Sequence, residues 1–167
     1  MPPDIYTHNQ QTASSDLSDP ELQHTLRLLQ AAQQQPSHVD PALVPQGTSL
    51  VDLLHARTDQ LALIVGSGVQ TETRQLACIT LKNAMLKRID SLPPAQTQFA
   101  CNALMQVLDG PIRRIAASAL AGVFAHDPER WPELLPALLN LTNIPSTTQE
   151  VSGAWYCLEL ICQDAAE

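Results

Sequence analysis

The sequence predicts an all-α protein, a right-handed α-solenoid of about four helical hairpins, and three observations support this fold class. Apolar residues recur at helical spacing, and strand-like alternation never lasts more than a few residues. Only two Phe, two Tyr and two Trp occur in 167 residues, so aliphatic side chains must fill the core. Helical pairs also repeat, because Leu76, Ile115 and Val151 stand at equivalent positions 39 and 36 residues apart.

The N-terminal part divides into a tail and a first helical pair. Residues 1–18 are polar and predict a disordered tail ahead of a repeat region over 19–167. Ser18 or Asp19 can cap a helix that starts at Pro20 and ends near Pro36. The proline-rich stretch 37–47 predicts a loop before a second helix, which carries Leu50, Val51, Leu53 and Leu54.

The rest of the chain alternates short and long helices. Residues 58–68 predict a short apolar helix ended by Gly66 and Gly68, which are too few to make a phosphate-binding loop. The spacing predicts further helices over 71–89, 95–110, 111–127, 131–143 and 146–167, with Trp131 opening the fourth of them. At the connector before Trp131, Asp127 and Glu129 are expected to act as caps.

The long helices align residue by residue. The register that pairs Leu76 with Ile115 also pairs Ala77 with Ala116 and Leu81 with Leu120. Ser152 and Tyr156 continue these two sets in the last helix, and an irregular helical bundle is the alternative to a solenoid. Arg74 and Arg113 begin successive long helices, where they are expected to bridge to the next repeat, with a partner contact as the alternative.

The formal charge of −8 is distributed unevenly. Between Arg74 and Arg114 there are six bases and two acids, whereas from Asp127 onward there are seven acids and one base. The overall sign argues against free nucleic acid as a partner, and the bipolar pattern suits a protein of mixed charge, unless it only solvates helix faces. No leader or run of 18 apolar residues occurs, so we expect a soluble, non-secreted protein without a membrane partner.

Catalytic and metal chemistry are not expected. The five His are scattered, and no residue stands in an activating context, so we predict neither an enzyme nor a bound cofactor. The four Cys (Cys78, Cys101, Cys157 and Cys162) lie in apolar helical patterns and are expected to be reduced, packed thiols without zinc.

Two motifs carry a resemblance to a known family. LACITLKNAMLKRI resembles the "LKN" helix of the importin-β (karyopherin) N-terminal domain, and RWPELLPALLNLTN resembles the Trp-Pro-Glu-Leu helix that follows it there. GPIRRIAASALAGVFAHDPERW looks like the intervening repeat. ELQHTLRLLQAAQ and CLELICQDAAE look most like transportin-type receptors, and the likeness covers about residues 20–167, whereas the proline-rich segment 37–57 departs from the family's first repeat.

The resemblance implies a function. Family members are solenoids of HEAT repeats whose N-terminal repeats bind the small GTPase Ran in its GTP form during nuclear import. A protein of this type would work in the cytoplasm and nucleus. This chain resembles the first four repeats, so cargo or nucleoporin binding would belong to a longer form. The alternative is a truncated or generic HEAT-repeat scaffold without Ran binding.

Seven residues are candidates for the contact with Ran. On the predicted helix 71–89, Thr80, Asn83 and Lys87 fall within one polar strip, and Lys82 lies at its edge. By resemblance Lys82, Asn83, Lys87 and Arg88 match basic inner positions of the family, although Asn83 could be a buried amide and the bases could merely be solvated. In the last helix the candidates are Trp155, Glu159 and Asp164, with core packing the alternative for Trp155.

Overall fold

The computed structural model describes residues 17–34, 40, 42–143 and 153–165, and helices joined by turns and loops make up this part of the protein. These residues contain no strand, so the all-α prediction is confirmed, while the tail predicted over 1–18 lies almost wholly outside them. The helices are α1 (Pro20–Gln33), α2 (Leu50–His55), α3 (Thr58–Gly66), α4 (Thr71–Arg88), α5 (Pro94–Gln106), α6 (Arg113–His126), a 3-10 helix η2 (Pro128–Arg130), α7 (Leu134–Thr142) and α8 (Gly153–Asp164).

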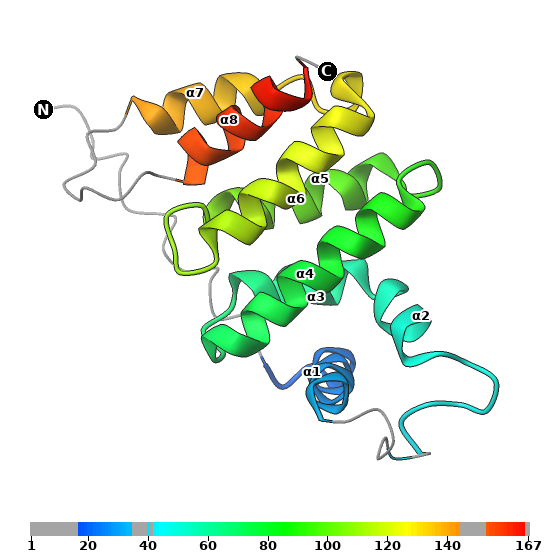
Figure 1. The fold of residues 1–167 in the computed structure, drawn as a ribbon. Coiled ribbons are helices and arrows are strands. Elements are labelled where there is room, and N and C mark those ends of the chain that lie inside the picture. The colour runs from blue at the N-terminus through cyan, green and yellow to red at the C-terminus, as the bar shows by residue number, and fades with distance from the viewer. Residues whose placement is uncertain (1–16, 35–39, 41, 144–152, 166–167) are drawn as a thin grey trace, which may run out of the picture.

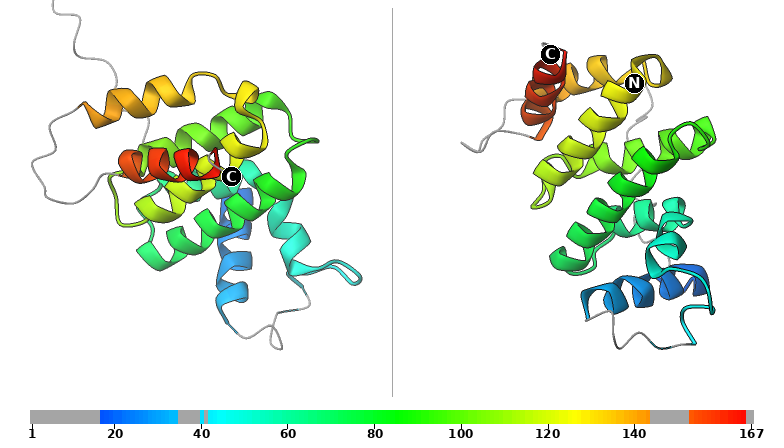
Figure 2. Two further views of the ribbon diagram at one scale, coloured as in Figure 1. Left: turned by 45° about the horizontal axis from the view of Figure 1, so that its top comes forward. Right: turned by 45° about the vertical axis from the view of Figure 1, so that its right-hand side comes forward.

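The helices succeed one another from α1 at one end to α7 and α8 at the other (Figures 1 and 2). α4, α6 and α8 lie side by side in that order, with α3 and α5 behind them (Figure 1). α3 packs against α4 and α5, and α6 packs against α4, α5 and α8. α7 packs against α8, whereas α1 packs across α2, α3 and α4. Each helix thus contacts elements close to it in the sequence.

Most helix ends follow the sequence signals. The Asp19 carboxylate accepts the amide hydrogen of Glu21 at 2.9 Å, and Pro20 occupies the first turn of α1. The Asp127 carboxylate accepts from the Glu129 amide at 3.2 Å, so its predicted capping role is confirmed. α7 begins at Leu134, and the prediction that Trp131 opens it is wrong: Trp131 has an extended φ of −140°, between η2 and the first turn of the helix.

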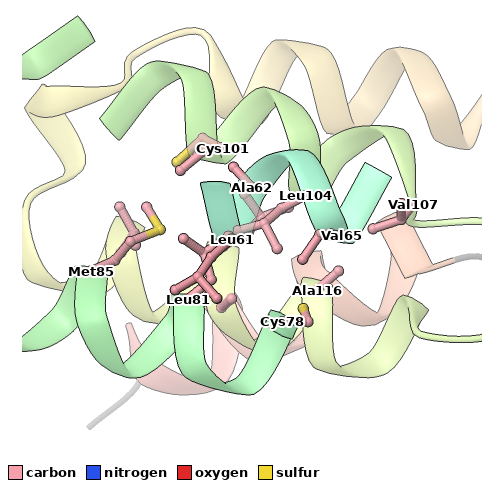
Figure 3. Close-up of a cluster of buried hydrophobic side chains, with 14 of the residues drawn as sticks. Leu61, Ala62, Val65, Cys78, Leu81, Met85, Cys101, Leu104, Val107 and Ala116 are labelled. Atoms are coloured by element: carbon pink, nitrogen blue, oxygen red, sulfur yellow. The ribbon is translucent and has the colours of Figure 1, made fainter. Parts of the chain in front are cut away.

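The core is built from leucines that meet between the layers. Leu61 of α3, Leu81 of α4 and Leu104 of α5 are fully buried in one cluster (Figure 3). Small side chains such as Cys78 and Ala116 fill the spaces between them. Each buried Leu contributes about 2 kcal/mol to stability through its removal from water. Leucines can therefore stabilise this core without aromatic side chains.

One glycine marks the closest approach between two segments. The Gly153 amide, at the start of α8, donates to the Leu108 carbonyl at 2.9 Å. A Cβ placed on Gly153 would lie 2.2 Å from that oxygen and 3.0 Å from the Cβ of Arg113. Only glycine therefore allows the start of α8 to meet the connection between α5 and α6.

Replacing Gly153 by Ala should lower the free energy of unfolding by about 2 kcal/mol, because the added methyl meets backbone rather than a side chain that could move. Urea denaturation followed by circular dichroism measures the change. Gly68→Ala is the matched control, since a Cβ there meets nothing within 4 Å. Equal stability of Gly153→Ala and the parent would contradict the close contact.

The cysteines divide into two groups. Cys78, Cys101 and Cys157 are buried, as predicted, and burial raises the pKa of each thiol to about 12. Cys162 is exposed, so the prediction that it is packed is wrong. At 100° per residue, five positions turn Cys162 far from the buried side of α8 that holds Cys157.

A thiol reagent at about pH 8 should therefore modify one cysteine of the folded protein rapidly, because the thiolate form reacts and the buried thiols remain protonated. All four should react after unfolding in guanidinium. Mass spectrometry should place the first label on Cys162, and its absence from Cys162→Ser is the control. Rapid labelling of Cys78 in the folded chain would contradict this assignment.

Candidate partner-binding surface

The candidate residues lie on two helices separated by a third. Four of them belong to α4 (Lys82, Asn83, Lys87 and Arg88) and three to α8 (Trp155, Glu159 and Asp164). α6 lies between α4 and α8, so the two groups form separate ends of one face (Figure 1). A single partner would have to span α6 to contact both groups.

Asn83 is exposed, so the alternative of a buried amide is wrong. Thr80, in the same strip, is half-buried, and its hydroxyl donates to the Leu76 carbonyl at 2.8 Å within α4. Ile79, one turn before Asn83 on the same side of α4, is 43% exposed. The outer side of α4 therefore presents one amide next to an apolar side chain, rather than a purely polar strip.

The Lys82 side chain crosses from α4 to α6. Its ammonium donates to the Ser118 hydroxyl at 2.7 Å, and both groups are partly buried. The long stem of Lys82 thus runs between the helices, as expected for a residue at the edge of the strip. This bond ties α4 to α6 across 36 residues of sequence.

Lys87 and Arg88 connect α4 with α2. The Lys87 ammonium lies 3.2 Å from the Asp52 carboxylate in an exposed ion pair, which holds the pKa of Asp52 below its ordinary value. The Arg88 guanidinium donates to the His55 carbonyl at 3.0 Å, at the C-terminal end of α2. These two bases therefore satisfy charge and carbonyl groups within the protein.

On α8 the exposed candidates do not all share one side. Trp155 is 55% exposed, so it is not a core residue, and Glu159 lies one turn further along the same side. Asp164 is exposed, but nine positions turn it half-way round the helix from Trp155. Beside them, the Arg114 guanidinium of α6 lies 5.7 Å from the centre of the Tyr156 ring. Trp155 and Glu159 thus form one candidate patch without Asp164.

Other arginines bind the ends of helices. Arg74 Nε donates to the Val65 carbonyl at 2.9 Å, at the C-terminal end of α3. This bond stays within the α3–α4 hairpin, so the expected bridge from Arg74 to the next repeat is wrong. Arg130, which sequence reasoning missed, donates to the carbonyls of Ile89 and Leu92 after the end of α4. Its only sequence signal is its separation of about one repeat from these residues.

Among the described residues, no group of three His, Cys, Asp or Glu side chains is arranged to hold a metal ion. No described helix combines the length and the hydropathy needed to cross a membrane. No protein-family model, curated protein or solved structure matches the sequence significantly.

His55 should make stability depend on pH. Burial and the nearby Lys87 and Arg88 charges lower its pKa from 6.5 in the folded protein, although Asp52 opposes this shift. The unfolded chain therefore takes up the proton at a higher pH than the folded chain. The stability that neutral His55 contributes to the folded protein is fully present above about pH 6.5, and it is lost as the pH falls below this value.

The test compares urea unfolding of the parent and His55→Gln at about pH 7.5 and about pH 5.5. The parent should lose more stability than the variant over this range, because glutamine takes up no proton. The control is His126→Gln on α6. This variant should still show the loss of stability between the two pH values that is due to His55. An identical loss in the parent and in His55→Gln would contradict the prediction.

Proposed function

We propose that this chain is a HEAT-type α-solenoid and forms the N-terminal part of a transportin-like nuclear import receptor. Its activity would be to bind the small GTPase Ran in its GTP form, in the cytoplasm and nucleus, through the face that carries α4, α6 and α8. Cargo and nucleoporins would bind a longer form. The proposal starts from the two sequence motifs, and the packing of the helices supports its structural half.

The strongest support is the equivalence of α4 and α6. Ala77 and Ala116, paired by the repeat register, are both fully buried, and so are Leu81 and Leu120. Residues at the same place in a repeat should have the same neighbours, because each repeat packs only on those beside it. An irregular bundle imposes no such equality.

Polar contacts between helices support the same repeat. In the described part of the chain, nine side-chain bonds join groups 32–41 residues apart, close to the period of the sequence. Arg57 reaches Glu21 across 36 positions, and Gln96 reaches Asp59 across 37. Contacts of this kind link one unit with the next, which is typical of a linear array.

For the partner contact, the observations favour Asn83, Trp155 and Glu159, because these side chains are exposed. An exposed Trp beside an acidic residue is a suitable anchor for a protein surface that is apolar with a basic margin. Lys87 could join them by exchanging Asp52 for an acidic group on Ran, since an exposed ion pair contributes little stability.

One observation favours the alternative, a HEAT scaffold without Ran binding. Eight of the nine bases have contacts within the chain, namely Arg57, Arg74, Lys82, Lys87, Arg88, Arg113, Arg114 and Arg130. The basic middle of the sequence can therefore be explained by internal structure alone.

Titration of the full chain with Ran loaded with GTP or with GDP, by calorimetry, tests the proposal. We expect binding only in the GTP state, and Trp155→Ala should weaken it by about 2 kcal/mol, as is usual for a Trp anchor. Leu139→Ala is the matched control, because Leu139 is 52% exposed on α7, outside the proposed face. Equal or absent binding in both nucleotide states would contradict the proposal. The alternative, a HEAT-repeat scaffold without Ran binding, would then stand.

A charge exchange tests the role of Lys87 separately. Lys87→Glu combined with Asp52→Lys keeps an ion pair between α2 and α4 but reverses the charge at each position. If Lys87 contacts Ran, the double variant should bind more weakly and with a smaller dependence on salt. An unchanged affinity would remove Lys87 from the contact.

A further inference from the structure

The turn after α4 carries an exposed hydroxyl next to two bases. Ser91 follows Lys87 and Arg88 in the sequence KRIDSLP, which puts Arg88 three residues before it and Leu92 directly after it. Its side chain is exposed, and its hydroxyl donates to the Arg88 carbonyl at 3.0 Å. An arginine at this distance before a serine, followed by an apolar residue, is what many basic-directed protein kinases recognise.

The residues next to Ser91 in this turn contact His126, at the end of α6, and Arg130, in the η2 helix that follows it. Arg130 donates to the carbonyls of Ile89 and Leu92, on either side of Ser91. His126 lies 3.3 Å from the carboxylate of Asp90. Ser91 therefore lies within a turn that is contacted by one guanidinium and one imidazole from a different helical pair.

We propose that Ser91 is a phosphorylation site for a serine/threonine kinase that recognises Arg88, and that Arg130 binds the resulting phosphate. In the reaction, the Ser91 oxygen attacks the γ-phosphorus of Mg-ATP. One P–O bond forms to the serine, the bond to the β-phosphate oxygen breaks, ADP leaves, and the hydroxyl proton passes to the kinase's carboxylate. The proposal is independent of Ran binding.

The kinase can reach this segment because it lies at a helix end. Presenting Arg88 and Ser91 in extended form requires the last turn of α4 to open, the bonds from Arg130 to the Ile89 and Leu92 carbonyls to break, and the buried side chains of Ile89 and Leu92 to leave the core. Terminal turns open at lower free energy than helix interiors. Arg88 would give up its bond to the His55 carbonyl for an acidic group of the enzyme.

The modification changes the connection between the two hairpins. It removes the hydroxyl proton that Ser91 gives to the Arg88 carbonyl, and it places about two negative charges near the C-terminal end of α4, where the helix dipole disfavours them. The guanidinium of Arg130 already bonds to the carbonyls on either side of Ser91, so it turns from these carbonyls to the phosphate. The carbonyls of Ile89 and Leu92 then lose their donor, and the turn opens.

The first test incubates the full chain with Mg-ATP and the catalytic subunit of cAMP-dependent kinase, a basic-directed enzyme. Mass spectrometry should place the phosphate on Ser91. Thr142 is a matched internal control, because its hydroxyl also donates to a carbonyl three residues back, at 2.8 Å, but Leu139 stands where Arg88 stands for Ser91. Arg88→Gln should lower the rate about tenfold, the factor carried by one charge-assisted hydrogen bond.

Phosphate on Thr142 at an equal rate, or none on Ser91, would overturn the assignment. Circular dichroism of Arg88→Gln shows whether the variant is folded, so that a rate change caused by unfolding can be recognised.

The second test measures hydrogen exchange before and after phosphorylation. Amides of residues 89–92 and 128–131 should exchange faster in the phosphorylated chain. In Arg130→Gln they should be fast already, and phosphorylation should add a smaller increase than in the parent, because only the loss of the Ser91 bond to the Arg88 carbonyl and the charge at the end of α4 then contribute. If phosphorylation changes exchange equally in the parent and in Arg130→Gln, Arg130 does not bind the phosphate.

Discussion

The close approach of α6 to its neighbours is the constraint on which the other contacts depend. α6 packs against α4 on one side, α8 on the other and α5 behind, and its buried residues are mostly alanines. Gly122 continues this small surface, because a Cβ there would lie 3.5 Å from the Leu86 side chain of α4. Larger side chains on α6 would separate the layers. The leucines of α3, α4 and α5 then could not meet in one cluster.

Short distances between helices bring helix ends close to long side chains of other helices. The last carbonyls of a helix lack partners within it, so a buried end needs a donor from elsewhere. Arg74, Arg88 and Arg130 supply these donors to the ends of α3, α2 and α4. The helix dipole favours a cation at each of these ends. The positive charges of Arg74 and Arg88, in the middle of the chain, are thus explained by the helix ends that they cap.

The sequence allowed the helices to be predicted because their signals are local. Asp19 and Pro20 mark the start of α1, and Gly66 and Gly68 mark the end of α3, within a few residues of the turns they form. The partners of charged side chains were not predictable in this way. Nothing near Lys87 indicates that Asp52, 35 residues earlier, pairs with it. Periodicity likewise indicates which residues share a side of a helix, but not whether another helix covers that side, as Cys162 shows.

The same contacts rank the candidate residues by what a partner must displace. Asn83, Trp155 and Glu159 require least, since their side chains are exposed and the Glu159 carboxylate would give up only a bond from Gln163, one turn along α8. Lys87 requires the loss of one exposed ion pair, which costs little. If a partner bound Arg88, the His55 carbonyl at the end of α2 would lose its donor. If it bound Lys82, the partly buried hydrogen bond between α4 and α6 would have to break. A partner that binds without loosening the stack must therefore approach mainly from the α8 end and from the outer side of α4.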